Sequence, residues 1–249
     1  PIEKYFDVPQ PARSITIHQL LTHTAGVMEN CGRDFDRLTR AEMITKCLAK
    51  VNSPGKFLYS NLGYSLLAAV IERVTQKSVD IYLAEHFFQP LGMKSTGYFF
   101  PDSFHRRLAF GYSGMGSNPP ISDTLKSMGD SFWNLKGNGG IQASVDDMYV
   151  WYRALTHGPI LTPEMRKVLT TPYVTRDDGI KYGYGWFIRT SDDGQVAQVS
   201  HTGSDEVFLS AFVWRPSDKS FYYFVTNNRD KGGADAVREI LQILKDGNK

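Results

Sequence analysis

Residues 54–75 read PGKFLYSNLGYSLLAAVIERVT, and this stretch carries the most information about the fold. The Pro54-Gly55 pair forces a turn, and from Leu62 onward apolar residues recur at helical spacing. A helix this rich in apolar side chains is expected to be buried. The polar triplet Tyr59-Ser60-Asn61 therefore lies between a tight turn and a rigid element, a place from which side chains can be presented to a cleft.

The sequence on both sides of this stretch predicts further helices. Residues 15–23 and 40–51 precede it as two helices, and residues 79–90 follow it as another. Residues 101–138 are predicted to be rich in loops, because their glycines and prolines oppose long regular elements. The run from Ser144 to Asp147 is predicted to open the next helix as a capping box, in which a hydroxyl and a carboxylate satisfy amide protons of the first turn.

After residue 180 the pattern changes to short runs of aromatic and β-branched residues separated by turns. The predicted strands follow one another as an antiparallel meander: residues 184–188, 195–201, 209–214 and 221–226. An amphipathic helix over residues 234–245 closes the chain. Helices first and a meander last indicate an α+β fold, with a helical lobe formed by residues 24–145 and a lobe built on the antiparallel sheet by residues 1–23 and 146–249.

The charge balance argues against a nucleic acid as partner. Lys and Arg number 28 and Asp and Glu number 26, which leaves a formal charge of +2 without any basic run. No apolar run approaches the ~18 residues of a membrane span, and the first residues show no signal-peptide pattern. A small molecule or a peptide is the expected ligand, and no cofactor or metal is implied.

Cys31 and Cys47 have no histidine at ligand spacing, and we interpret both as free thiols.

Tyr59 and Asn61 have side chains suited to proton transfer and to binding an amide. A phenol can move a proton when a cation lowers its pKa, and a carboxamide can both donate and accept hydrogen bonds. The alternative is structural, because a tyrosine and an asparagine in a turn often serve as a packed ring and a turn former. Spacing alone favours this structural alternative.

The run Ser200-His201-Thr202-Gly203-Ser204 ends a predicted strand. Gly203 has no side chain to obstruct a ligand lying along the strand, and the amide of Ser204 would then face that ligand. His201 can orient or polarise a neighbouring group. The alternative is a strand end with a surface histidine and a hairpin glycine, which is the stronger interpretation when the run is considered alone.

Considered together, these segments resemble the serine β-lactamase and penicillin-binding-protein family, in its class C β-lactamase, esterase and D-aminopeptidase branch. The resemblance extends over nearly the whole chain. It rests on five sequence motifs that occur in the same order as in the family: residues 15–26, 54–64, 139–147, 182–186 and 200–204. It implies a β-lactamase/transpeptidase-like fold and acyl transfer through a covalent serine ester. The resemblance also favours a periplasmic or extracellular location.

The resemblance implies roles for individual residues. Tyr59 takes part in proton transfer beside a lysine, and Asn61 holds the amide of the substrate. His201 stands where many members have the lysine of a Lys-Thr-Gly motif. The run Thr202-Gly203-Ser204 lines the substrate, and its last amide supplies half of an oxyanion hole, where charge develops in the transition state.

Two departures from the family pattern limit this prediction. An unperturbed imidazole, with a pKa of about 6.5, is mostly neutral at pH 7, so His201 should hold a carboxylate-bearing β-lactam less firmly than a lysine does. The His-x-Gly form resembles the esterase and D-peptide-processing members of the family, which implies that β-lactams are secondary substrates. The second departure is the Ser-x-x-Lys motif, whose only formal match is Ser53-Pro54-Gly55-Lys56. Pro followed by Gly cannot build a helical turn, so we reject this match and expect the true motif upstream of Pro1.

Arg229 follows a predicted strand and can reach a substrate carboxylate, although a solvated arginine explains it equally well. A second functional hypothesis is a binding or regulatory module that keeps the cleft but performs no covalent catalysis. The remaining histidines show no partner pattern and are interpreted as surface or satisfied core residues: His18, His23, His86, His105 and His157.

Overall fold

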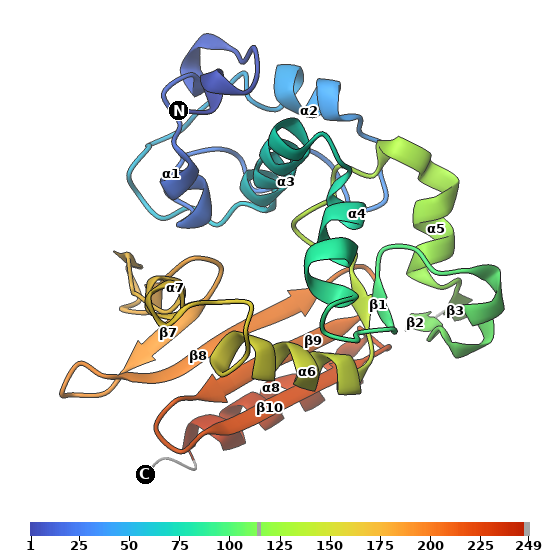
Figure 1. Cartoon of the computed structure of the whole chain (residues 1–249), viewed down its shortest axis with the longest axis vertical. Coiled ribbons are helices and arrows are strands. Elements are labelled where there is room, and N and C mark those ends of the chain that lie inside the picture. Colours follow the sequence, from blue (N-terminus) through green and yellow to red (C-terminus); the bar gives the residue numbers. More distant parts are fainter. Residues whose placement is uncertain (114–115, 247–249) are drawn as a thin grey trace.

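A computed structural model describes residues 1–113 and 116–246 of the chain (Figure 1). The helices are α1 (Ile17–Leu21), α2 (Arg40–Lys46), α3 (Asn61–Thr75), α4 (Val79–Leu83), α5 (Ile121–Met128), α6 (Val145–Thr156), α7 (Pro163–Leu169) and α8 (Lys231–Asp246). The strands are β1 (Thr96–Gly97), β2 (Gly111–Ser113), β3 (Gly116–Asn118), β4 (Gln142–Ala143), β5 (Val174–Thr175), β6 (Lys181–Tyr182), β7 (Phe187–Thr190), β8 (Val196–Ser204), β9 (Leu209–Arg215) and β10 (Ser220–Thr226). No helix within the described ranges is both long enough and apolar enough to cross a membrane.

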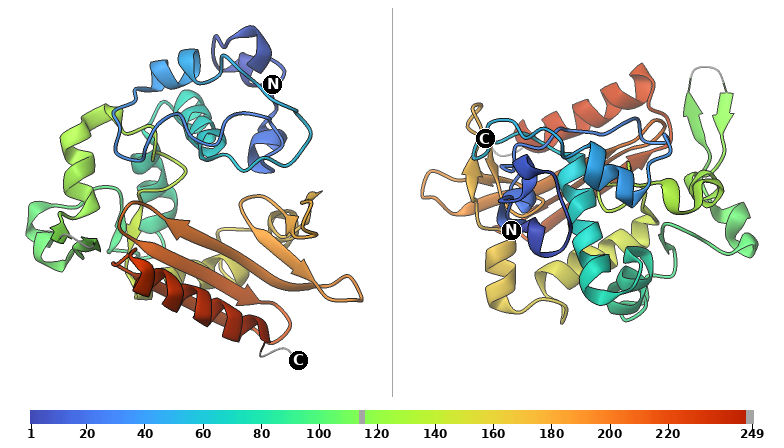
Figure 2. Two further views of the ribbon diagram at one scale, coloured as in Figure 1. Left: turned by 180° about the vertical axis from the view of Figure 1, so that it is seen from behind. Right: turned by 90° about the horizontal axis from the view of Figure 1, so that it is seen from above.

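The main sheet is antiparallel, with the strand order β10-β9-β8-β7-β6-β5. Its strands β7 to β10 form the predicted meander, although β7 covers Phe187–Thr190 where residues 184–188 were expected. Trp214 of β9 pairs with Val199 of β8 and with Phe221 of β10. The ring of Trp214 packs in one apolar cluster with Tyr152 of α6. Helix α8 lies on the opposite face, so the sheet is enclosed between two helices (Figure 2). The predicted α+β class, with an antiparallel sheet flanked by helices, is confirmed.

A second core lies above the sheet in Figure 1 and is built around α3. Leu62, Leu66 and Ala69 recur at helical spacing and are buried, as the sequence predicts for this helix. The first residues of the chain join the same core through Ile2 and Ile15. The division into lobes at residues 23 and 145 stays a prediction, but the segment before residue 23 packs with the helices around α3.

Residues 101–138 are rich in loops as predicted, but they also contain α5 and the paired strands β2 and β3. Ile121, Leu125 and Met128 recur at helical spacing along α5, and all three are buried. Pro120 is the N-cap residue of this helix, a position where the missing N–H of proline removes no helical hydrogen bond. The proline therefore marks the beginning of a helix and not its absence.

The capping box predicted for α6 forms only in half. Ser144 accepts the expected hydrogen bond from the amide of Asp147 at 3.1 Å. The carboxylate of Asp147 does not return to the N-cap; it accepts from the amide of Ser95 at 2.7 Å and from the hydroxyl of Thr96 at 2.8 Å. The buried carboxylate thereby ties the start of α6 to β1. The last helix, α8, is amphipathic as predicted, although Ile240 is exposed.

Cys31 and Cys47 form a disulfide bond, so the expectation of free thiols is wrong. Their Cα atoms are 5.7 Å apart, a separation that disulfides commonly span. Cys47 is the C-cap residue of α2, and α2 brings it next to the loop that contains Cys31. Spacing alone does not reveal this return, because two cysteines without a pattern give no information on pairing.

Candidate active site

Tyr59 lies in a segment without regular secondary structure, whose backbone is held by a neighbouring loop. The hydrogen bonds run from the amides of Asn52, Gly55 and Leu58 to the carbonyls of Gly26, Thr24 and His23, at 2.7, 2.8 and 2.7 Å respectively. Gly26 has a φ of +73°, and a Cβ at this position would lie 2.2 Å from the carbonyl oxygen of Asn52, so the approach requires glycine. The loop therefore fixes the backbone on which Tyr59 is presented.

Ser60 begins α3 as its N-cap residue. Its hydroxyl accepts a hydrogen bond from the amide of Gly63 at 2.9 Å and donates one to the carbonyl of Met28 at 2.7 Å. The hydrogen bonds of Ser60 therefore also restrict the backbone of Tyr59 and Asn61 on either side of it. The predicted triplet is thus located where the sequence places it, at the start of the buried helix.

Strand β8 extends beyond its partner β7, which leaves part of its backbone open. The pairing of β7 ends where Phe187 lies opposite Ser200. Residues 201–204 pair with β9, and no described strand pairs with them on the other side. The side chains of this run beyond His201 are exposed. The run that the sequence predicts to line a substrate therefore has an edge to which an extended ligand can add hydrogen bonds.

Tyr59 and His201 meet at this open edge. The Tyr59 hydroxyl oxygen is 3.4 Å from Nε2 of His201, and the Tyr182 hydroxyl oxygen is 3.5 Å from the same nitrogen. The imidazole of His201 stacks on the ring of Phe187, with centroids 5.4 Å apart, and Trp186 approaches it edge-on at 6.5 Å. The surroundings of His201 are therefore aromatic, with two phenol hydroxyls as polar contacts.

This environment favours a neutral imidazole. Burial lowers the pKa of His201 below its ordinary value, and a hydrogen bond with the backbone of Thr202 opposes that effect as the smaller cause. At pH 7 the ring consequently carries no fixed charge. The site thus differs electrostatically from one with lysine at this position, in the direction that the sequence predicts.

His23 is a member of the site that the sequence analysis missed. Its side chain is buried, and its Nδ1 accepts a hydrogen bond from the amide of Ser60 at 3.1 Å. Burial, and to a lesser extent the nearby His201, lower the pKa of His23 to about 3. Because the neutral ring accepts at Nδ1, its proton is on Nε2, which donates to the Tyr182 hydroxyl at 3.0 Å. His23 is indeed a buried residue with its hydrogen bonds satisfied, as interpreted from the sequence. The sequence interpretation did not place it next to Tyr59, where its ring lies.

The phenols of the site hold their protons strongly. Burial, and after it the carboxylate of Glu29, raise the pKa of Tyr59. Burial also raises the pKa of Tyr64 and of Tyr182. The described imidazoles beside Tyr59 are neutral, so they supply no cation that would lower its pKa. A proton-transfer role for Tyr59 therefore requires a cation from another group or a simultaneous transfer of its own proton.

The other predicted site residues lie around this centre. Asn61 donates from Nδ2 to Oδ1 of Asn30 at 2.8 Å. A side chain at position 203 would clash with the neighbouring strand as well as with a ligand, because a Cβ there would lie 2.5 Å from the Ser210 hydroxyl oxygen. Arg229 is exposed and donates to the carbonyl of Asp205, just beyond β8, at 2.6 Å. The guanidinium is therefore placed near the end of β8 by a backbone contact.

Ser53 is not in the position of a nucleophile. Residues 53–56 form an exposed turn outside any helix, and Ser53 has a positive φ of 45°. A Ser-x-x-Lys motif needs both side chains on one face of a helix, so that the amine can take the hydroxyl proton. The turn geometry agrees with the rejection of Ser53 and Lys56.

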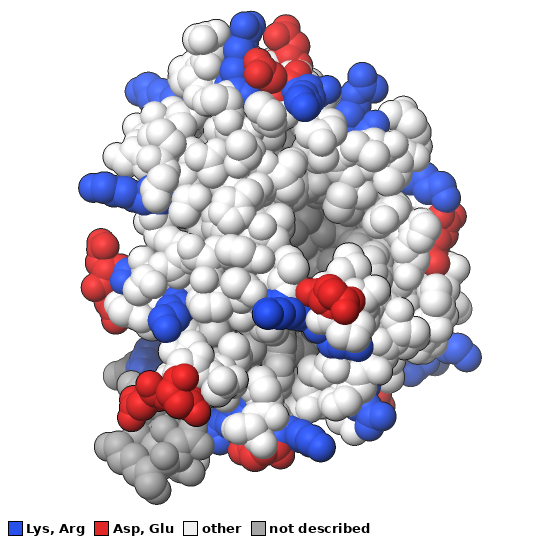
Figure 3. Space-filling model, turned by 60° about the vertical axis from the view of Figure 1, so that its left-hand side comes forward, with Lys and Arg blue, Asp and Glu red and all other residues white. Residues whose placement is uncertain are grey.

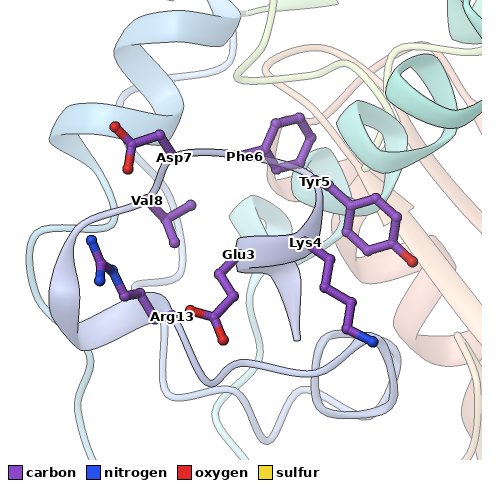
Figure 4. A pocket seen from close by; sticks show the side chains of 7 residues that line it. All are labelled: Glu3, Lys4, Tyr5, Phe6, Asp7, Val8 and Arg13. Atoms are coloured by element: carbon purple, nitrogen blue, oxygen red, sulfur yellow. The ribbon is translucent and has the colours of Figure 1, made fainter.

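Two cavities of the described structure lie away from the residues of this site. One, of about 350 Å³, lies near the N-terminus and is lined by acidic and basic side chains together with Tyr5, Phe6 and Val8 (Figure 4). The other, of about 310 Å³, lies between Phe100 and Lys126.

In the part of the chain that is described, no group of three or more His, Cys, Asp or Glu side chains could hold a metal ion. One face of the molecule shows charged side chains scattered around a broad surface of other residues, hollowed near its centre (Figure 3).

Comparison with known proteins places this geometry in context. Among curated proteins, the chain is 28% identical over 217 residues to Protein flp of Staphylococcus aureus strain MW2, covering 82% of the chain and 41% of that protein. It thus spans less than half the length of this relative. Among solved structures, the penicillin-binding protein from Bacillus halodurans superimposes with a TM-score of 0.79 at 24% identity, covering 98% of this chain and 77% of that one. A β-lactamase/D-alanine carboxypeptidase from Yersinia pestis gives a TM-score of 0.75 at 22% identity, covering 100% and 76%.

The similarity to these solved structures shows which fold the chain has. A match to a family's sequence model shows which family it belongs to. The pattern described as Beta-lactamase matches residues 1–246, which is nearly the whole chain and includes the segments carrying Tyr59 and His201. The fold is that of serine hydrolases related to penicillin-binding proteins. The chain belongs to the Beta-lactamase family.

Proposed function

We propose that this chain forms the substrate-binding part of a serine hydrolase, which acts through an acyl-enzyme on an ester, a D-amino-acid peptide or a β-lactam. The observation that carries the proposal is the meeting of Tyr59 and His201, 3.4 Å apart, at the open edge of β8. In this proposal the nucleophilic serine and its lysine come from a Ser-x-x-Lys segment outside residues 1–249.

The substrate lies along residues 201–204 as an added strand. Main-chain groups at this edge bind the substrate backbone, and the amide of Ser204 donates to the carbonyl oxygen that becomes negatively charged. Loss of one such donor typically costs about 3 kcal/mol of transition-state stabilisation. Arg229, placed just beyond this run, provides a positive charge for the far end of the substrate.

Tyr59 transfers the proton of the nucleophilic serine. When the serine oxygen attacks the carbonyl carbon, its proton passes to the Tyr59 oxygen and the proton of Tyr59 passes to Nε2 of His201. The imidazolium then returns the proton through Tyr59 to the departing oxygen or nitrogen. A neutral imidazole is needed for this relay, and burial of His201 supplies one. The lysine that accompanies the serine supplies the cation that Tyr59 otherwise lacks.

The neutral His201 also bears on the choice of substrate. A substrate carboxylate finds no fixed charge at this position, so neutral esters and amides are the preferred classes. The similar structure from Yersinia pestis is of a β-lactamase/D-alanine carboxypeptidase, which supports keeping β-lactams and D-amino-acid peptides among the proposed substrates.

The alternative is a binding or regulatory module with the same fold, which holds a peptide or a β-lactam but forms no covalent bond. Reaction of the full-length protein with a fluorophosphonate and with a fluorescent penicillin separates the two. Covalent labelling at a serine of a Ser-x-x-Lys segment is the expected result. Binding of penicillin that is fully reversible, with no adduct from either reagent, would establish the binding module instead.

A further inference from the structure

The amide of Ser60 decides which nitrogen of His23 carries the proton. A backbone amide can only donate, and this one donates to Nδ1 of His23 over 3.1 Å. Burial lowers the pKa of His23 to about 3 and so keeps the ring neutral, which leaves its single proton on Nε2. His23 is 2% exposed, and its ring lies against the ring of Tyr59, with centroids 4.2 Å apart. The backbone beside Tyr59 therefore fixes the tautomer of a buried imidazole.

The hydroxyl of Tyr182 accepts a hydrogen bond from this N–H and has a proton of its own to donate. Nε2 of His23 lies 3.0 Å from the Tyr182 oxygen, and Tyr182 is fully buried. A buried phenol proton without an acceptor is costly, so it must be directed at a polar neighbour. Among the described residues, two groups can accept it: Nε2 of His201, 3.5 Å away, and the Tyr64 hydroxyl, whose own proton goes to the carbonyl of Leu21 at 2.9 Å.

His201 is the stronger of these two acceptors. Burial lowers the pKa of His201, and a hydrogen bond with the backbone of Thr202 raises it to a smaller extent, which makes the ring the donor in that bond. Nε2 faces the hydroxyls of Tyr59 and Tyr182, so Nδ1 is the donating nitrogen and Nε2 keeps a free electron pair. An unprotonated imidazole nitrogen accepts a hydrogen bond more strongly than a phenol oxygen does. The distance of 3.5 Å is long, as catalytic contacts often are before a substrate binds.

We propose that Tyr182 is a positioning residue that donates to Nε2 of His201 and so holds this nitrogen unprotonated, in the state that accepts the proton of Tyr59. His23 acts one step behind it, because the N–H of His23 occupies the Tyr182 oxygen and turns the Tyr182 proton toward His201. When Nε2 takes the proton of Tyr59, the Tyr182 hydroxyl turns its own proton to the Tyr64 oxygen and accepts from the new N–H. The Tyr59 oxygen regains a proton from the nucleophilic serine, so the protons balance. The inference rests on the proposed function, because it assigns tasks within the same site.

The protonation of both imidazoles is measured without any catalysis, by ¹⁵N NMR of the full-length protein at pH 7. Protonated and unprotonated ring nitrogens have well-separated shifts, and a hydrogen bond donated to an unprotonated nitrogen moves its shift upfield. We expect Nε2 of His201 to be unprotonated and its Nδ1 to carry the proton. In His23, Nε2 should carry the proton. The opposite tautomer at either ring overturns the proposal, whatever the variants show.

Two changes at position 182 test the donor itself. Tyr182→Phe removes the hydroxyl, so the Nε2 resonance of His201 should move downfield. A fluorotyrosine at position 182 keeps the ring and the hydroxyl but has a more acidic phenol, so the same resonance should move upfield. Tyr184→Phe removes a hydroxyl of the same turn, which contacts Nδ1 of His18 at 2.8 Å, and should leave the resonance in place. A resonance that does not move in the fluorotyrosine protein, or in folded Tyr182→Phe, shows that the Tyr182 proton is directed at Tyr64 and overturns the proposal.

The consequence for acylation is measured with p-nitrophenyl butyrate. Tyr182→Phe should lower kcat by about fivefold, the effect of about one hydrogen bond, and should change KM by less than about twofold, because Tyr182 acts on His201 and not on the substrate. Tyr184→Phe should keep both constants. An unchanged kcat in Tyr182→Phe, with or without a rise in KM, overturns the task in proton transfer. Absence of turnover by the unsubstituted protein refutes the proposed function, and the NMR result still decides the role of Tyr182.

Discussion

His23 offers a quantitative test, because the structure buries its imidazole in a neutral state within the site. The pKa of this ring is lowered to about 3, whereas an imidazole in an unfolded chain has a pKa of about 6.5. Between these two values the unfolded state binds a proton that the folded state rejects. The stabilisation associated with neutral His23 is therefore complete above pH 6.5 and is lost as the pH falls toward 3.

The size of this loss follows from the difference in pKa. Each pH unit below 6.5 lowers the free energy of unfolding by about 1.36 kcal/mol, until the folded state also begins to bind the proton. The contribution lost is about 3 kcal/mol at pH 4 and about 4 kcal/mol at pH 3. This is a large part of the 5–15 kcal/mol that typically stabilises a domain.

Urea unfolding of the chain and of a His23→Gln variant at several pH values isolates this contribution. Other titrating groups contribute to both proteins, so they cancel in the difference between the two free energies of unfolding. We expect that difference to shrink by about 3 kcal/mol between pH 7 and pH 4. His157→Gln, at the exposed end of α6, is the matched control for the loss of a surface histidine. A difference between the chain and His23→Gln that stays constant with pH would refute the description of a buried neutral imidazole.

Further predictions concern selectivity, the rejected serine and a buried ion pair. His201→Lys in the full-length protein should shift the ratio of specificity constants from esters toward carboxylate-bearing β-lactams, because it restores a cation; an unmoved ratio contradicts the selectivity argument. Residues 1–249 expressed alone should form no fluorophosphonate adduct at Ser53, since this residue lies in a turn without a helical lysine; intact-protein and peptide mass spectrometry detect any such adduct. Lys136→Met should lower the free energy of unfolding by about 1–3 kcal/mol, because Glu72, 9% exposed, loses its partner at 2.8 Å and keeps Arg40 at 3.1 Å. Chemical unfolding at pH 7 measures the loss, and a change below about 1 kcal/mol would contradict it.

The sequence predicts α3 and the meander well, because each has a strong and regular pattern. Leu62, Leu66 and Ala69 follow the helical period, and the strands that carry Trp214 and Phe221 are bounded by turn residues. The period of α3 reflects burial of one helix face. Strand β9, which is buried on both faces of the sheet, is recognised by its run of aromatic and β-branched residues between turns. Helix α5 is not predicted from the sequence because its apolar face is short and its proline is also typical of loops, although a proline can begin a helix.

The candidate site divides in the same way. Tyr59, Asn61 and His201 are found from the sequence because each belongs to a phrase that resembles a family, although the resemblance does not test their roles. His23 is not found, because its importance depends on contacts with Ser60 and Tyr182, far along the chain. The disulfide is missed for the same reason. Residues that act by holding others show no local pattern, and only the fold reveals what they touch.

The most direct test of the proposed site is the rate at which the full-length protein is acylated when Tyr59 loses its hydroxyl. Tyr59→Phe keeps the ring and its packing and removes only the oxygen that lies 3.4 Å from His201. With p-nitrophenyl butyrate in stopped flow, we expect acylation to slow by about 10²–10⁴-fold, with unfolding little changed. Tyr149→Phe, a tyrosine that is 50% exposed on α6, should acylate at the original rate. Equal acylation rates for Tyr59→Phe and the unsubstituted protein would contradict the site described here.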